Sequence, residues 1–317
     1  MNTSSVKGHI FISKLSVTRV SAYLRKYWFI YMLVAPGLIL LIVFHYLPIY
    51  GILIAFKDYK FTKGILGSPW VGFKNFEEIL LEYDFLMVVK NTVIINIYNI
   101  FFGTSFTIML ALFLNEIRSS FIKRVSQTLV YLPGFISWVI MAGLVSQFLS
   151  PTDGAINKLI QALGGEPIYF LMMPQYFRGI LVVSGILKSA GYGTIYYLAA
   201  IAGVNPELYE SAVIDGAHRG HLMWYITIPR IKPIIAVLLI LSMAGLFSSN
   251  FEQVFNLLNP TVYDTGDVIS TYLYRTTFQN PRYEAGAAIG IVFQVFGLMS
   301  LLLSNYVVKK FNVTGIL

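Results

Sequence analysis

The chain contains no cysteine and little charge. None of its 317 residues is cysteine, and Asp, Glu, Lys and Arg together make up 12% of the sequence. Without cysteine there is neither a disulfide framework nor a thiolate metal site, and the four histidines do not form a ligand cluster. The sequence also lacks a phosphate-binding G-x-x-x-x-G-K-[ST] loop, an H-E-x-x-H zinc helix and a G-x-S-x-G nucleophile elbow. We therefore expect no metal site, no cofactor bound by this chain and no catalytic residues.

Apolar residues dominate the sequence instead. Hydrophobic residues make up 56% of the chain and the mean hydropathy is +0.69, so the composition indicates a membrane protein. A transmembrane helix needs about 20 mostly apolar residues. The stretches that meet this length are roughly Trp28 to Phe56, Val88 to Leu114, Thr128 to Leu149, Phe177 to Gly203, Ile231 to Ser249 and Ala285 to Val308. The sequence thus predicts an all-α membrane protein with six transmembrane helices over residues 28–308.

Charged residues are distributed unevenly between alternate flanks of these stretches. The tails 1–27 and 309–317, together with the loops around 115–127 and 204–233, carry 13 basic and 4 acidic residues. The opposite flanks carry 8 basic and 11 acidic residues. Because basic residues accumulate on the cytoplasmic side of a membrane, we expect both termini and the loop 204–230 to be cytoplasmic. The formal net charge of +8 then reflects topology, and we expect no nucleic-acid partner.

The loop 204–230 carries the signals of a helix that starts and ends between two spans. Asn205 can cap a helix that begins with Pro206, and Glu207 places a carboxylate near its positive end. Gly216 can end this helix in a left-handed conformation. A second short helix is expected from Ala217 to about residue 225.

This predicted helix–turn–helix is open to two interpretations. Small residues at its bend would let a partner approach closely, while Glu210, Asp215 and Arg219 would fix the orientation through charge-assisted hydrogen bonds. Alternatively, it is an amphipathic segment that only rests on the lipid surface. The residues alone do not decide between them.

Two groups of polar residues are candidates for a substrate path. Lys188 lies near the middle of the fourth predicted span, beside Tyr192, and an intramembrane charge marks either a functional cavity or a structural pair. The fifth span ends in a polar run that contains Asn250, Phe251, Glu252 and Gln253. Aromatic, amide and carboxylate groups suit sugar binding, although the same run also fits an ordinary exit into a loop.

The segment from Glu210 to Pro229 resembles the E-A-A-x-x-D-G-A…I-x-L-P loop of the inner-membrane permeases of binding-protein-dependent ABC importers. It departs from that pattern only mildly, at Ser211 and Ile228. The residues that it keeps are Glu210, Ala212, Ile214, Asp215, Gly216, Ala217, Ile226, Thr227 and Pro229. In that family the loop is the coupling helix that enters a cleft on a cytoplasmic ATPase subunit. The resemblance thus implies a set of coupling residues: Tyr209, Glu210, Ala212, Asp215, Gly216, Ala217, His218 and Arg219.

Further blocks are similar to the sugar-importer branch of this family, in particular the LplB-type polysaccharide permeases. They are Ile54 to Tyr59, Gly64 to Phe76, Phe251 to Val254, Asn259 to Asp264 and Val268 to Tyr272. Together they imply a type I importer permease fold and a sugar cargo, expected to be an oligosaccharide derived from a polysaccharide.

The resemblance also implies a set of partners in the cytoplasmic (inner) membrane of a prokaryote. A second, homologous permease subunit would complete a heterodimer, two ATPase subunits would bind ATP and Mg, and an extracytoplasmic solute-binding protein would deliver the sugar. The alternative function is a secondary transporter or channel without an ATPase. The helix–turn–helix and the lack of an inverted repeat visible in the sequence argue against it.

Overall fold

The computed structural model defines residues 23, 25–247 and 251–310, with side chains up to residue 307. It divides into two compact units, Met1–Leu53 and Ile54–Leu317. The described residues are mainly helical and contain no β-strand, only an isolated bridge between Lys57 and Trp70. The predicted all-α class is therefore confirmed.

The first unit is described by one helical run. Helix α2 (Trp28–Leu41) is followed by a π-helical segment, Ile42–Tyr46, and then by the 3₁₀ helix Leu47–Phe56, whose last residues belong to the second unit. Pro36 lies inside α2 without ending it. The α2 side chains are almost all exposed although they are apolar, which is the pattern expected of a helix surrounded by lipid.

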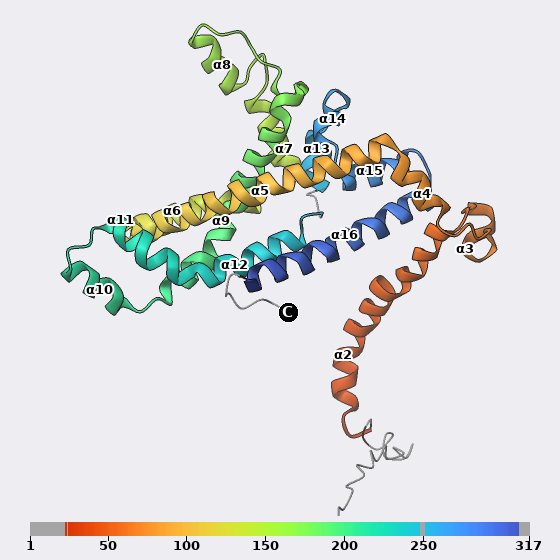
Figure 1. Cartoon of the computed structure of the whole chain (residues 1–317), viewed down its shortest axis with the longest axis horizontal. Helices are drawn as coiled ribbons and strands as arrows, with labels where there is room; N and C mark the ends of the chain where they lie inside the picture. Colours follow the sequence, from red (N-terminus) through yellow and green to blue (C-terminus); the bar gives the residue numbers. More distant parts are fainter. Residues whose placement is uncertain (1–22, 24, 248–250, 311–317) are drawn as a thin grey trace, which may run out of the picture. The chain divides into compact units, whose positions relative to one another are not determined.

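The second unit contains the remaining helices. In chain order they are η3 (Phe61–Lys63), α3 (Gly64–Gly67), α4 (Lys74–Leu81), α5 (Tyr83–Glu116), α6 (Ser120–Tyr131), η4 (Leu132–Phe135), α7 (Trp138–Phe148), α8 (Ala155–Ala162), η5 (Phe170–Met172), α9 (Pro174–Ala202), α10 (Pro206–Ile214), α11 (Arg219–His221), η6 (Leu222–Thr227), α12 (Ile228–Ala244), α13 (Phe251–Leu257), η7 (Pro260–Val262), α14 (Tyr263–Gly266), α15 (Ile269–Tyr274), η8 (Arg275–Gln279) and α16 (Tyr283–Lys310). Helix α5 packs along α9, and α12 lies beside α16 (Figure 1).

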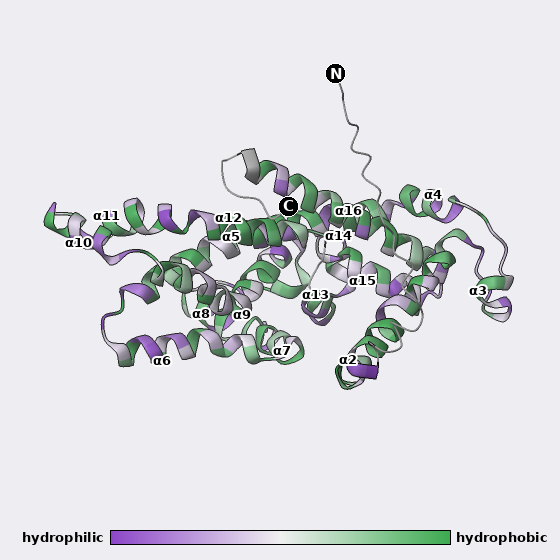
Figure 2. Cartoon of the chain, turned by 90° about the horizontal axis from the view of Figure 1, so that it is seen from below, coloured by the Kyte–Doolittle hydropathy of each residue, from purple (hydrophilic) through white to green (hydrophobic). Residues whose placement is uncertain are grey.

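Among the described residues, four helical runs are long and apolar enough to cross a membrane. They are Trp28–Phe56, Tyr83–Glu116, Arg219–Ala244 and Tyr283–Val307. Figure 2 shows that hydrophobic residues cover most of α12 and α16, whereas α6 and α10 carry more hydrophilic ones. Helix α9 has 29 residues but includes charged Arg178 and Lys188, and it is not among the four. The predicted count of six spans therefore stays a prediction.

The third predicted span, Thr128 to Leu149, is not a single straight helix. Its two halves, Ser120–Phe135 and Trp138–Phe148, meet at an angle of 102° and count together as one broken span at most. Pro133 lies in the 3₁₀ turn η4 and cannot donate a backbone hydrogen bond. The Ser137 side chain then caps a new helix by accepting from the Ile140 N–H. The prediction of a continuous helix was wrong because hydropathy averages over this local break.

Close packing of α9 depends on its glycines. A Cβ atom at Gly193 would lie 2.6 Å from the Thr107 side chain, and one at Gly191 would lie 2.2 Å from the carbonyl oxygen of Val130. Neither distance is compatible with a side chain. These glycines therefore let α5 and the α6 end approach the α9 backbone.

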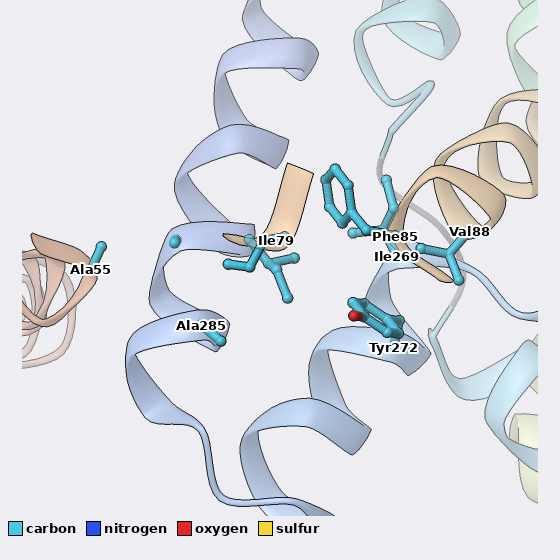
Figure 3. Close-up of a cluster of buried hydrophobic side chains, with 9 residues drawn as sticks. Ala55, Ile79, Phe85, Val88, Ile269, Tyr272 and Ala285 are labelled. Atoms are coloured by element: carbon cyan, nitrogen blue, oxygen red, sulfur yellow. The ribbon is translucent and has the colours of Figure 1, made fainter. Parts of the chain in front are cut away.

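A buried hydrophobic cluster joins α4, α5, α15 and α16. Figure 3 shows Ile79, Phe85, Ile269 and Tyr272 facing one another, and each of them is at most 6% exposed. The cluster joins residues 55–88 to residues 269–289, which are far apart in the sequence. It anchors the starts of α5 and α16 to each other, because both helices contribute buried residues to it.

Glu82 ties the edge of this cluster together. Its carboxylate accepts hydrogen bonds from the Tyr272 hydroxyl at 2.5 Å and from Arg282 Nη1 at 2.8 Å. Burial opposes ionisation of Glu82, but these hydrogen bonds and the positive charge of Arg282 outweigh it and lower the pKa of the carboxyl. Burial, together with the contact to Glu82, raises the pKa of Tyr272.

Candidate functional site

Helix α10 forms where the capping signals predict it. The Asn205 side chain accepts a hydrogen bond from the Glu207 N–H at 3.1 Å, and Pro206 occupies the first helical turn. The helix ends at Ile214. The first half of the predicted helix–turn–helix is therefore confirmed.

The turn after α10 is built on Gly216. Its φ angle is +83°, which glycine adopts without the Cβ penalty of other residues. The Gly216 N–H donates to the Val213 carbonyl at 3.0 Å, and the Ala217 N–H donates to the Ala212 carbonyl at 2.9 Å. This pair of hydrogen bonds defines a Schellman motif. No atom lies within 4 Å of the position of a Cβ on Gly216, so the bend faces open space.

The second helix differs from the prediction at both ends. It begins at Arg219 rather than at Ala217, because the His218 side chain accepts from the His221 N–H at 3.4 Å and serves as its N-cap. It does not end near residue 225, since the π-helix η6 continues it into α12 as one helical run, Arg219–Ala244. Pro229 lies just after the π turns, at the start of α12, where its missing N–H is tolerated.

Two side-chain contacts involve the loop, one within it and one to helix α5. The Tyr209 hydroxyl lies 3.1 Å from the Thr227 hydroxyl and joins α10 to η6. Arg219 lies 3.6 Å from Glu116 at the end of α5. This ion pair is largely solvent-exposed and adds little stability. Its geometric effect is to hold the bend at the end of α5.

Apolar side chains surround the bend on its exposed surface. Ile214 is 86% exposed, Tyr225 76% and Trp224 68%. Such a concentration of exposed large apolar residues marks an interaction surface. The predicted charged residues Glu210, Asp215 and Arg219 are exposed beside it, as are Gly216 and His218. Tyr209, Ala212 and Ala217 are half-buried. The structure thus brings the predicted coupling residues together on one bend.

Lys188 and Tyr192 lie at the break between α6 and α7. The Lys188 ammonium donates hydrogen bonds to the carbonyls of Gly134 and Ile136, and it lies 5.3 Å from the centre of the Trp138 ring. The Tyr192 ring packs on Gly134, where a Cβ atom would lie 2.1 Å away. The two Lys188 hydrogen bonds thus provide a donor to carbonyls at the helix break.

The polar run at the end of the fifth predicted span is placed in part. Asn250 lies outside the described residues. Gln253 is 2% exposed and donates hydrogen bonds to the Leu181 carbonyl at 2.6 Å and to the Ser184 hydroxyl at 2.9 Å. Phe251 stacks on Phe255, with ring centres 5.0 Å apart, and Glu252 is exposed. Gln253 therefore joins α13 to α9, and its partner Ser184 lies one helical turn before Lys188.

A cavity of about 470 Å³ lies between α5, α9 and α12, and none of the predicted substrate-path residues that the structure describes lines it. Its polar lining comprises Asn99, Thr104, Thr107, Ser189, Tyr196, Tyr197 and Ser242. The sequence held a signal for it that was missed. Asn99, Gly103 and Thr107 follow one another at intervals of four residues and so lie on one face of α5, where a glycine separates two polar side chains. Hydroxyl, amide and aromatic groups are chemically suited to a sugar.

Comparison with known sequences identifies the family. The family described as "Binding-protein-dependent transport system inner membrane component" matches residues 103–313. The chain is 41% identical over 288 residues to the polygalacturonan/rhamnogalacturonan transport system permease protein YteP of Bacillus subtilis, with 91% of this chain and 90% of YteP covered. It is 39% identical to Protein LplB of the same organism, with 95% and 94% covered.

Solved structures show the same likeness. A chain of a bacterial alginate ABC transporter, in complex with an alginate pentasaccharide-bound periplasmic protein, matches with a TM-score of 0.84 and 39% identity. The match covers 94% of this chain and 100% of that one. A second alginate transporter structure gives a TM-score of 0.84 at 40% identity, with 92% and 99% covered. The chain therefore belongs to the family of inner-membrane permease components of binding-protein-dependent transport systems.

Proposed function

We propose that this permease is one transmembrane half of an ATP-driven importer for an oligosaccharide derived from a polysaccharide. The observation that carries the proposal is the exposed bend at Gly216, which is fixed by a Schellman motif and surrounded by exposed apolar side chains. The sugar cargo is supported by relatives named for polygalacturonan, rhamnogalacturonan and alginate transport. The close likeness to these permeases favours an importer over a secondary transporter or channel.

In this proposal the chain crosses the cytoplasmic membrane of a prokaryote six times, with both termini in the cytoplasm. The excess of basic residues in the tails and in the loops around 115–127 and 204–233 supports this orientation. Helix α9 and the broken pair α6–α7 then supply the two spans that, with the four long apolar runs, make six. Helix α9 is long enough, since 29 residues extend about 43 Å at 1.5 Å per residue.

The loop 204–230 docks into a cytoplasmic ATPase subunit, and ATP and Mg are bound by that subunit. The bend around Gly216 enters the partner, Ile214 and Trp224 bury their apolar surface, and Glu210 and Arg219 set the orientation. When two ATPase subunits close on ATP, the docked loops of this permease and of a second, homologous permease move with them. Because α11, η6 and α12 are continuous, movement of the loop passes directly into a membrane span.

Opposite this loop, an extracytoplasmic solute-binding protein delivers the sugar. The sugar then passes the cavity between α5, α9 and α12, where Asn99, Ser189 and Tyr196 offer amide, hydroxyl and aromatic contacts. Lys188 and Tyr192 support the path indirectly, because they hold the α6–α7 break against α9. The substrate undergoes no covalent change.

Co-purification tests this proposal directly. The tagged chain is isolated in mild detergent as wild type, as Ile214→Asp and as the control Leu163→Asp, and the bound proteins are identified by mass spectrometry. Ile214 and Leu163 are 86% and 81% exposed, so neither substitution disturbs the interior. We expect the wild type and the control to retain both a second permease and an ATPase. Ile214→Asp should retain the second permease and lose the ATPase. Recovery of a transport-competent chain without any ATPase would favour the secondary transporter.

A further inference from the structure

A second cavity, of about 200 Å³, lies in the segment that joins α13 to η8. Its lining residues are Phe255, Leu258, Tyr263, Thr271, Tyr274, Arg275 and Gln279. It shares no lining residue with the larger cavity between α5, α9 and α12. Figure 1 places α13, α14 and α15 away from α10 and α11, so this cavity is also distinct from the proposed docking loop.

The cationic group in this cavity is held in one orientation. Arg275 Nη2 lies 2.5 Å from Asp267 Oδ2, and the Asp267 side chain is 1% exposed. The other carboxylate oxygen of Asp267 accepts a hydrogen bond from the Thr271 hydroxyl at 2.7 Å. The Arg275 guanidinium also lies over the Tyr263 ring, 4.4 Å from its centre. Its position is therefore fixed from two sides.

This arrangement leaves Arg275 able to bind a ligand. A guanidinium carries five N–H donors, and the ion pair with Asp267 uses Nη2. The Arg275 side chain is 22% exposed, so water or a ligand can reach it. A buried ion pair is by itself a weak source of stability. Its clearer physical effect here is to preorganise a guanidinium at the wall of a cavity.

The remaining lining supplies aromatic and amide groups. The lining rings of Tyr274 and Phe255 lie 5.1 Å apart, and Phe251 and Phe278, outside the lining, each pack 5.4 Å from the Tyr274 ring. Gln279, the last residue of η8, is exposed and offers an amide. Aromatic faces suit the apolar side of a sugar ring, amides suit its hydroxyls, and a guanidinium matches a carboxylate in geometry and charge.

We propose that this cavity binds a carboxylated sugar residue, a uronate, of the transported oligosaccharide, with Arg275 paired to its carboxylate and Gln279 to its hydroxyls. The inference rests on the proposed import function and deepens it, since it specifies an acidic substrate. The fixed guanidinium would favour a uronate over a neutral sugar of the same shape, because only the uronate gains a charge-assisted hydrogen bond.

Binding calorimetry tests the inference on the importer complex in lipid nanodiscs. The probes are trigalacturonate and its neutral counterpart, in which the carboxylates are reduced to alcohols. Wild type should bind trigalacturonate the more tightly. Gln279→Ala should weaken that binding about fivefold, the effect of one hydrogen bond of about 1 kcal/mol, whereas the matched control Asn280→Ala, an exposed neighbour that does not line the cavity, should not.

A second variant tests the cation while sparing the fold. Arg275→Lys keeps a positive charge beside Asp267 but loses the planar guanidinium, and we expect about tenfold weaker binding of trigalacturonate, or about 1.4 kcal/mol. Equal binding of both probes, or binding that neither variant changes, would overturn the uronate site. ATP-dependent uptake of only the neutral probe would also overturn it, while the importer function would stand. Absence of ATP-dependent uptake of any sugar would instead contradict the proposed function.

Discussion

Single polar side chains fix the backbone where this chain departs from regular helix. Asn157 is fully buried. Its side-chain nitrogen donates hydrogen bonds to the carbonyls of Leu149, Ser150 and Ile168, and its side-chain oxygen accepts one from the Ile168 N–H. It thereby closes the loop around α8. Gly216 has the same importance for the bend after α10, since no other residue adopts a φ of +83° so easily.

The single residue Glu82 should make the stability of the fold depend on pH. Since its folded pKa is lowered from the ordinary value of 4.5, its contribution is present above that value and is lost as the pH falls through the folded pKa. Glu82→Gln should therefore unfold at a lower temperature than wild type at pH 7, and the difference should shrink below about pH 4.5. Thermal unfolding of the detergent-solubilised chain across this range measures it. A difference that stays constant with pH would show that ionised Glu82 has no such role.

At the scale of elements, the joint between α6, α7 and α9 departs from regular helix. Pro133 and Ser137 end one helix and start the next, at an angle of 102°. Lys188 of α9 then satisfies the freed carbonyls of Gly134 and Ile136. The Lys188 ammonium thus meets its desolvation cost through backbone dipoles and the Trp138 ring.

Removing this cation should loosen the joint. Lys188→Met leaves the two carbonyls without their donor, at a cost of roughly 1–3 kcal/mol, so we expect a lower unfolding temperature and slower sugar uptake, with the ATPase still attached. The matched control is Lys158→Met, because Lys158 is exposed on α8. Calorimetry and uptake measured in parallel give the comparison. Equal unfolding temperatures for the two variants would contradict the role of Lys188 at the joint.

Features set by neighbouring residues could be predicted from the sequence, and features set by distant ones could not. Asn205, Pro206 and Gly216 act within one turn of their own position, so α10 and its bend were predicted closely. The cavity between α5, α9 and α12 gathers residues from 99 to 242, and only folding brings them together. The π-helical continuation through η6 was also missed, because helix signals assume a 3.6-residue period.

At the scale of the whole molecule, our proposal derives the orientation in the membrane from the charge distribution. The chain lacks cysteine, so single cysteines introduced at exposed sites report on topology without background. We expect a membrane-impermeant maleimide to label Leu163→Cys in intact cells, and Val213→Cys only after permeabilisation, since the loop 204–230 is cytoplasmic in our proposal. Both side chains are more than half exposed. The reverse labelling pattern would contradict the proposed orientation.

The energy source is the central claim about the whole molecule. The most direct measurement is uptake of a radiolabelled oligogalacturonide into proteoliposomes that contain the purified complex, with the binding protein outside and nucleotide trapped inside. Our account predicts accumulation with ATP and Mg, and none with a non-hydrolysable ATP analogue. Accumulation without nucleotide, driven by an ion gradient alone, would contradict it.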